Sequence, residues 1–321
     1  MRFPVNRRCF LKSASVGVAA VGTGAATSVL GADPQAGTTA EGLNLPYAFK
    51  PAGETVPFGK DSPLGVAFDA KGNLYVAVAK SVRVFDPQGK DVRTLTVPDV
   101  ARCVAVDDEG MVYVGLKTSL AKFDASGQSV ATWGNEGRES GQLLYVTGVA
   151  VDNKRGALYV CDAGNRKVHR YSLNGDYVDS QAGFTIPSPF FSCALDPQGR
   201  LWVANTAEHR LERFDSDWQR QEKWGEYGTA PHQFCGCCNP TNFAFMADGI
   251  CVTAEKGIPR LKAYSTPGQL VAFLGPDAFS AGVAGLDVAV DGMGRIAVVE
   301  PKANQVRFYR LEPSGGKGAK G

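Results

Sequence analysis

The chain alternates short apolar stretches with turns, and one such pattern recurs six times. In each copy an apolar strand, usually ending in Asp, leads through a Gly-containing turn into a second apolar strand. Asp bonds to nearby turn backbone and Gly supplies a positive φ, so this pattern predicts antiparallel strands joined by tight turns. The first strands of the six copies are Val66–Asp69, Val104–Asp107, Val149–Asp152, Cys193–Asp196, Phe243–Met246 and Val288–Asp291.

A third and a fourth strand extend most copies. The third strand ends in an aromatic residue, which is Phe85, Phe123, Tyr171, Phe214, Tyr264 or Tyr309. The starts of the copies lie 38, 45, 44, 50 and 45 residues apart. Four strands at this spacing are typical of a propeller blade. The sequence therefore predicts an all-β fold, a six-bladed β-propeller over residues 62–312.

The last copy lacks a fourth strand, because the chain after Tyr309 soon reaches a Gly/Lys-rich tail at 313–321 that we expect to be flexible. An open blade would leave an unpaired strand edge, so we expect a strand from the N-terminal segment 33–61 to close the ring. Pro46–Lys50 and Thr55–Gly59 are the two candidates, and we prefer the first.

The third copy carries the clearest family resemblance. Gly148–Tyr171 contains Gly-Val-Ala-Val-Asp, then Leu-Tyr-Val-Cys-Asp, then Asn165 and Lys-Val-x-x-Tyr, and it resembles the NHL repeat. The resemblance covers residues 62–310 and implies the propeller fold. It implies no particular activity, because one propeller fold hosts many unrelated functions.

Residues 1–32 have the three parts of an export signal: a charged start, an apolar stretch rich in small residues, and a small-residue end. Arg7-Arg8 followed by Phe-Leu-Lys resembles a twin-arginine signal, which implies export of the folded protein to the periplasm or beyond. We expect cleavage near Ala32. The apolar stretch is short for a membrane span, so we expect no stable membrane anchor after cleavage.

The charge of the mature chain is close to balanced. The whole sequence carries a formal net charge of +2, but four of its basic residues fall within 1–32, leaving 30 basic residues against 32 acidic ones. This balance gives no basic excess for nucleic acid or an anionic membrane, so we expect neither as a partner.

Polar residues gather at the predicted ends of the inner strands in the third to sixth copies. Propellers usually bind ligands at the mouth of the central channel, on loops that enter the innermost strand or leave the second. The residues predicted to reach this rim are Asp162, Asn205, Asn242, Glu255, Asp287 and Glu300. Asp162, Asn242, Asp287 and Glu300 offer the oxygen ligands that calcium prefers, as do rim residues of calcium-dependent lactonases of similar shape. Alternatively, Asp162 and Glu300 bond to the turn that follows the second strand.

The loop that enters the fifth copy is rich in sulfur. It contains His232, Cys235, Cys237 and Cys238, side chains suited to zinc or copper. Export to an oxidising compartment favours a disulfide instead. Without Cys9 the mature chain has seven cysteines, so at least one stays free, binds metal or pairs with another molecule.

Three functions remain open at this point. The first is a binding or scaffold module that presents its rim to a protein, peptide or carbohydrate. The second is a metal- or redox-dependent enzyme centred on the cysteine-rich loop. The third is a lactonase-like hydrolase with a cation at the rim. The sequence contains no phosphate-binding glycine loop and no dinucleotide fingerprint.

Overall fold

The computed structural model describes residues 42–265, 268–280 and 285–314 of the chain. The expected signal at 1–32, the start of the N-terminal segment at 33–41 and the end of the tail at 315–321 lie outside the described residues.

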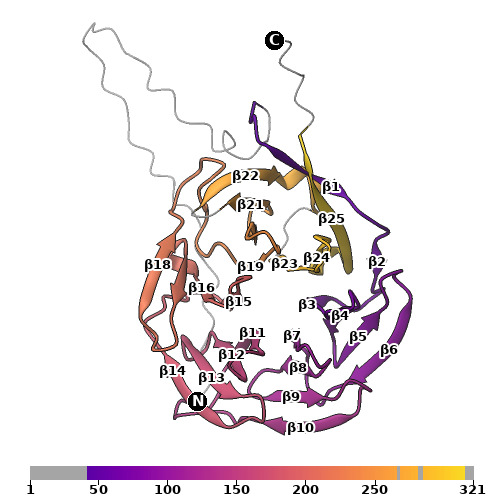
Figure 1. Cartoon of the computed structure of the whole chain (residues 1–321), viewed down its shortest axis with the longest axis vertical. Helices are drawn as coiled ribbons and strands as arrows, with labels where there is room; N and C mark the ends of the chain where they lie inside the picture. Colours follow the sequence, from indigo (N-terminus) through magenta and orange to yellow (C-terminus); the bar gives the residue numbers. More distant parts are fainter. Residues whose placement is uncertain (1–41, 266–267, 281–284, 315–321) are drawn as a thin grey trace, which may run out of the picture. The chain divides into compact units, whose positions relative to one another are not determined.

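Within these ranges, 25 strands form six antiparallel sheets that surround a centre, as Figure 1 shows. Blade 1 is β3 (Pro63–Phe68), β4 (Leu74–Val78), β5 (Ser81–Phe85) and β6 (Asp91–Thr96). Blade 2 is β7 (Cys103–Val106), β8 (Val112–Gly115), β9 (Leu120–Phe123) and β10 (Ser129–Trp133). Blade 3 is β11 (Val146–Asp152), β12 (Ala157–Asp162), β13 (Lys167–Ser172) and β14 (Tyr177–Gln181).

The other half of the ring follows the same order. Blade 4 is β15 (Cys193–Leu195), β16 (Leu201–Asn205), β17 (Arg210–Phe214) and β18 (Arg220–Trp224). Blade 5 is β19 (Asn242–Phe245), β20 (Cys251–Ala254), β21 (Leu261–Ser265) and β22 (Gln269–Leu274). Blade 6 is β23 (Asp287–Val290), β24 (Ile296–Glu300), β25 (Gln305–Pro313) and, from the N-terminal segment, β1 (Tyr47–Pro51) and β2 (Val56–Pro57). Each innermost strand contacts the innermost strand of the next blade, and β23 contacts β3, so the ring is closed.

The second strand of every blade is fully buried, whereas fourth strands such as β6 and β10 are largely exposed. Second strands lie between the sheets of two neighbouring blades, so both of their faces take apolar side chains. The sequences Leu-Tyr-Val and Leu-Trp-Val meet that requirement, since β-branched and aromatic residues pack well on a pleated surface.

The turn between the first two strands explains the recurring Asp and Gly. In blade 1, Asp69 Oδ1 accepts the backbone N–H groups of Lys71 and Asn73 at 2.9 and 2.8 Å. Gly72 has φ +80°, a left-handed conformation that favours glycine.

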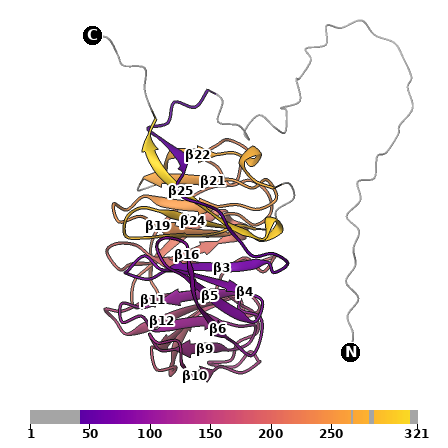
Figure 2. The same cartoon turned by 90° about the vertical axis from the view of Figure 1, so that its right-hand side faces the viewer.

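Both predicted closing segments take part in blade 6, so the fourth strand of this blade has two parts. β1 pairs with the second half of β25, where Phe49 lies opposite Leu311, and β2 pairs with its first half, where Val56 lies opposite Val306. Figure 2 shows the indigo strand of the N-terminal segment beside the yellow strand β25, with which β1 pairs. The nine residues of β25 make it long enough to pair with both segments.

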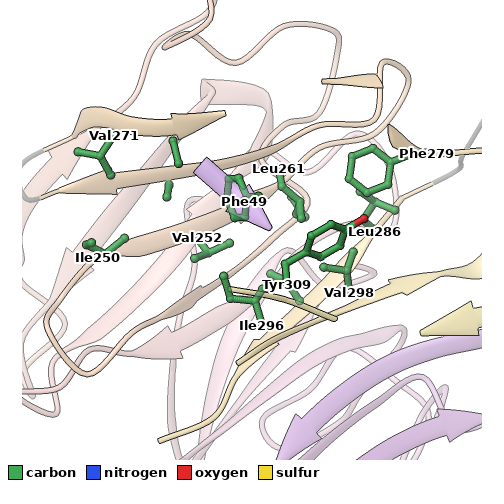
Figure 3. Packing of buried hydrophobic residues seen from close by; sticks show 14 residues of the cluster. Phe49, Ile250, Val252, Leu261, Val271, Phe279, Leu286, Ile296, Val298 and Tyr309 are labelled. Carbon is green, nitrogen blue, oxygen red and sulfur yellow. The ribbon is translucent and has the colours of Figure 1, made fainter. Parts of the chain in front are cut away.

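The N-terminal strand also contributes to the core. Phe49 is buried in the cluster between blades 5 and 6, where it meets the ring of Tyr309 edge-on at 6.4 Å between centroids (Figure 3). β1 therefore supplies apolar packing as well as backbone hydrogen bonds.

The helices in the described ranges are three 3-10 turns, η1 (Thr206–Glu208), η2 (Pro276–Ala278) and η3 (Pro301–Ala303). No helix within residues 42–265, 268–280 and 285–314 has the length and apolar character needed to cross a membrane.

Candidate functional site

A pocket of about 210 Å³ lies where the innermost strands begin, and residues from all six blades line it. We call it the channel-mouth pocket. Its polar side chains include Arg102, Tyr145, Asn242 and Asp287, and its apolar walls include Leu64 and Phe190. Two of the predicted rim residues, Asn242 and Asp287, therefore lie together in one concave site.

Asp287 is the first residue of β23. Its carboxylate accepts the backbone N–H of Val66 and its own neighbour Val288, each at 2.9 Å. Burial nevertheless raises the pKa of Asp287 to about 7, because it outweighs these two hydrogen bonds. No Lys or Arg of the described residues forms an ion pair with this carboxylate.

Arg102 and Tyr145 bring a second charged group to the pocket. The Arg102 guanidinium lies 4.2 Å from the centroid of the Tyr145 ring, and its Nη1 donates to the Tyr145 hydroxyl at 2.7 Å. Its Nε is buried and has no hydrogen-bond partner among the described residues. The guanidinium lines the pocket, where its remaining N–H groups can donate to a ligand oxygen.

Arg102 and Tyr145 are not among the rim residues predicted from the sequence. Each immediately precedes an innermost strand of the structure, β7 or β11, but both of these strands begin earlier than the predicted Val104–Asp107 and Val149–Asp152. The amide of Asn242 donates from Nδ2 to Leu286 O at 2.9 Å, which keeps its oxygen as an acceptor for a ligand.

Close backbone contacts shape the walls of this pocket. A Cβ added to Gly285 would lie only 2.3 Å from the Phe190 ring. Gly285 therefore lets the loop before β15 place Phe190 against blade 6.

A second, more open hollow of about 400 Å³ continues from the channel-mouth pocket over blades 2 to 4. The two share Tyr145 and Pro189, and the second also carries Lys117 and Glu136. Together they line a concave surface that extends from the channel mouth over blades 2 to 4.

The remaining rim candidates engage in local bonds. Asp162 is buried, and its two oxygens accept the backbone N–H groups of Leu144, Tyr145, Gly164 and Asn165 at 2.8 to 3.1 Å. Burial alone would raise its pKa, but these backbone groups and the His169 imidazole, 3.6 Å away, outweigh that effect and lower it. Asp162 thus holds the loop that carries Tyr145.

Asn205 and Glu300 have comparable roles. Asn205 Oδ1 accepts the backbone N–H of Thr185 at 3.0 Å, and its Nδ2 donates to Glu212 at 3.2 Å. Glu300 is buried, and Arg307 Nη1 lies 3.1 Å from its Oε1.

Glu255 lies in a buried cluster of charges in blade 5. Its two oxygens lie 2.5 Å from Arg260 Nη2 and 2.7 Å from Lys262 Nζ, and all three side chains are buried. Burial lowers the pKa of Lys262 to about 8, although Glu255 opposes the shift. Arg260 also contacts the cysteine-rich loop, since its Nη2 lies 2.9 Å from Cys235 Sγ.

The residues of the cysteine-rich loop do not converge on one point. His232 is 56% exposed and lies 3.6 Å from Glu226, while Cys235 is buried against Arg260. Cys237 is exposed and Cys238 is buried, with 3.3 Å between their sulfur atoms. In the described part of the chain, no three His, Cys, Asp or Glu side chains are grouped so that they could hold a metal ion. Each of the seven cysteines in that part carries a free thiol.

A larger cavity, of about 480 Å³, lies at the seam between blades 6 and 1, away from the channel mouth. Its two arginines bond to the protein itself: Arg83 lies 2.5 Å from Asp91, and Arg295 donates to Gly72 O and Pro87 O. We therefore place the candidate site at the channel mouth.

The sequence matches no family model and no curated protein. Among solved structures, the chain is similar to one described as "Streptogramin B lyase structure". The two share 12% identity and a TM-score of 0.57 over 83% of this chain and 98% of that one. At this identity the likeness supports the propeller fold alone.

Proposed function

We propose that this protein is a binding module whose channel-mouth pocket takes a peptide with a basic group. The observation that carries the proposal is Asp287, a carboxyl in a concave site with a raised pKa and no cationic partner among the described residues. An ammonium or guanidinium group of a ligand would supply the missing charge.

Two further features favour a peptide over a protein surface or a carbohydrate. The Arg102 guanidinium that lines the pocket suits a backbone carbonyl, and Asn242 adds an amide acceptor. The hollow that continues past Tyr145 and Pro189 gives an extended chain room on one side of the pocket. Ligand sites commonly combine apolar walls with a few such polar groups.

The test is a binding assay by fluorescence anisotropy with short labelled peptides that differ in basic, acidic and neutral residues. We expect the basic peptides to bind best and Asp287→Asn to weaken them at least about tenfold, since a tenfold change corresponds to about 1.4 kcal/mol. Asp248→Asn, in an exposed turn of blade 5, is the matched control and should leave binding unchanged.

Equal binding of acidic and basic peptides, or full affinity in Asp287→Asn, would contradict the proposal. Oligosaccharides belong in the same panel, and preferential binding of a neutral sugar would support the carbohydrate alternative. Calcium-dependent hydrolysis of a lactone that is lost in Asp287→Ala would support the hydrolase alternative instead.

We also propose that the repeats are of the NHL type and that residues 1–32 form a twin-arginine signal that directs the protein to the periplasm or beyond. The support is the repeat consensus in Gly148–Tyr171 and the Arg7-Arg8 pair. Replacement of both arginines by Lys should retain the protein in the cytoplasm. Mass spectrometry of the wild-type exported protein should find its first residue close to Ala32.

A further inference from the structure

We propose that Cys237 and Cys238 form a thiol–disulfide exchange site, in which Cys237 attacks a disulfide of another molecule and Cys238 resolves the mixed disulfide. This activity is independent of peptide binding at the channel mouth.

The two adjacent thiols are unequally exposed. Cys237 is exposed, whereas Cys238 is only 1% exposed, and their sulfur atoms are 3.3 Å apart. An incoming disulfide can reach Cys237, and Cys238 lies beside the sulfur that it would then attack. Exposure and a resolving partner are what this chemistry requires of a reactive cysteine.

The groups around the pair shift the pKa values of the two thiols in opposite directions. The Cys238 thiol donates a hydrogen bond to Cys237 and, with the Lys256 ammonium, lowers the pKa of Cys237 against the opposing effect of partial burial. Burial raises the pKa of Cys238, although Ser188 opposes this shift. The exposed sulfur is thus favoured as the thiolate and the buried one as the thiol.

Hydrogen bonds of the loop hold these groups in place. Asn239 donates from Nδ2 to Cys235 O and Lys256 O at 2.6 and 3.1 Å, and its Oδ1 accepts the Lys256 N–H at 2.9 Å. The Lys256 ammonium then donates to Ser188 at 3.2 Å. The backbone on both sides of the thiols is therefore fixed to the residue that carries the nearby positive charge.

The reaction has two balanced steps. The Cys237 thiolate attacks one sulfur of the substrate disulfide, which forms a mixed disulfide and releases the other sulfur as a thiolate. Cys238 then loses its proton to that thiolate or to water and attacks Cys237 Sγ, which releases the second substrate thiolate. The substrate disulfide gains two electrons, and the cysteine pair is oxidised to a disulfide.

A disulfide between neighbours in sequence is strained, because their Cα atoms, about 3.8 Å apart, are closer than in ordinary disulfides. Strained disulfides are easily reduced, so the oxidised pair can return to two thiols by exchange with an incoming thiol. A disulfide that is easily reduced suits an exchange site better than a permanent structural cross-link.

The test uses the purified, reduced protein and an aromatic disulfide reagent that releases a coloured thiolate. In the wild type, the reaction at this pair should release two equivalents and leave no aromatic group bound. Cys238→Ser should release one equivalent and keep one aromatic group on Cys237, detected by mass spectrometry. Cys237→Ser should slow the fast phase at least about tenfold, because the remaining thiol of the pair is buried. Cys251→Ala, which removes a core thiol of β20, is the control and should behave as the wild type.

Lys256 serves as a positioning residue and has its own readout. Lys256→Met should shift the pH profile of the fast phase to higher pH, and Lys256→Arg should restore it. Peptide mapping of the wild type after acid quenching provides a test that needs no variant, since it should find Cys237 joined to Cys238. A mixed disulfide that persists in the wild type, or an unchanged fast phase in Cys237→Ser, would overturn the proposal. Repetition with oxidised glutathione and with a disulfide-bonded peptide separates small from polypeptide substrates.

Discussion

The carboxylate of Asp287 accepts the backbone N–H of Val66 at 2.9 Å and so joins the last blade of the propeller to the first. The same carboxyl lines the channel-mouth pocket. One side chain therefore takes part in ring closure and in the candidate binding site.

We expect Asp287→Asn to change how stability depends on pH. The pKa of Asp287 is about 7 in the folded state and 3.8 in its ordinary environment. Between these values the folded protein holds a proton that the unfolded chain has lost, so wild-type stability falls as pH rises through this window. Asparagine does not titrate there. The free energy of unfolding, measured with urea, should therefore fall between pH 4 and pH 8 in the wild type. In the variant this fall should be smaller by on the order of 2 kcal/mol.

Asp277→Asn is the control for this experiment, because Asp277 is exposed and does not line the pocket. The unfolding free energy of this variant should depend on pH as steeply as that of the wild type. Parallel plots of unfolding free energy against pH for wild type and Asp287→Asn would contradict the raised pKa of Asp287.

Peptide binding should depend on the same titration. A cationic ligand binds the ionised carboxylate, so its affinity should rise from pH 5 to pH 8 and level off above the pKa of about 7. An arginine-containing peptide is the suitable probe, because its guanidinium stays charged throughout. The rise in affinity should disappear in Asp287→Asn. If the pH dependence persists in that variant, another titrating group causes it.

The buried charges of blade 5 give a prediction about stability. Glu255→Ala would leave Arg260 and Lys262 buried without their shared carboxylate, so we expect a loss of about 3–5 kcal/mol in urea unfolding. The matched control is Glu208→Ala, which removes the exposed partner of Arg210 and should cost less than about 1 kcal/mol. Similar losses in the two variants would show that burial does not set the strength of these pairs.

The closing strand can be tested through Phe49. Its side chain is buried against Tyr309, and Phe49→Ala should destabilise the protein by about 3–5 kcal/mol. Val92→Ala, on the exposed strand β6, should change stability by less than about 0.5 kcal/mol. Thermal unfolding followed by circular dichroism compares the two, and equal midpoints would mean that β1 adds little to the core.

The sequence predicted the fold well because every blade carries the same sequence repeat. Asp and Gly at the turn and an aromatic residue at the end of the third strand are local requirements of the backbone and the core. The closing strand was harder, since neither Pro46–Lys50 nor Thr55–Gly59 repeats that pattern. The structure uses parts of both, because β25 is longer than the other third strands.

The site was less predictable, for a physical reason. Asp162 and Asp287 are both acidic and both lie at the rim, yet backbone N–H groups surround the first while the second faces a pocket. That difference depends on how loops from neighbouring blades approach one another. Arg102 and Tyr145 meet for the same reason, although 43 residues separate them in the chain.

Ring closure through β1 also sets an order of events in synthesis. The strand that leaves the ribosome first belongs to the blade that is completed last, so the ring cannot close until almost the whole chain has been made. Until then β1 has no partner, and the segment that precedes it in sequence is joined to an unfinished domain. If residues 1–32 direct export as proposed, only residues 33–46 thus separate the leader from the strand whose pairing marks completion. An export machinery that accepts only folded proteins would therefore recognise a signal that lies close in sequence to the strand that pairs last.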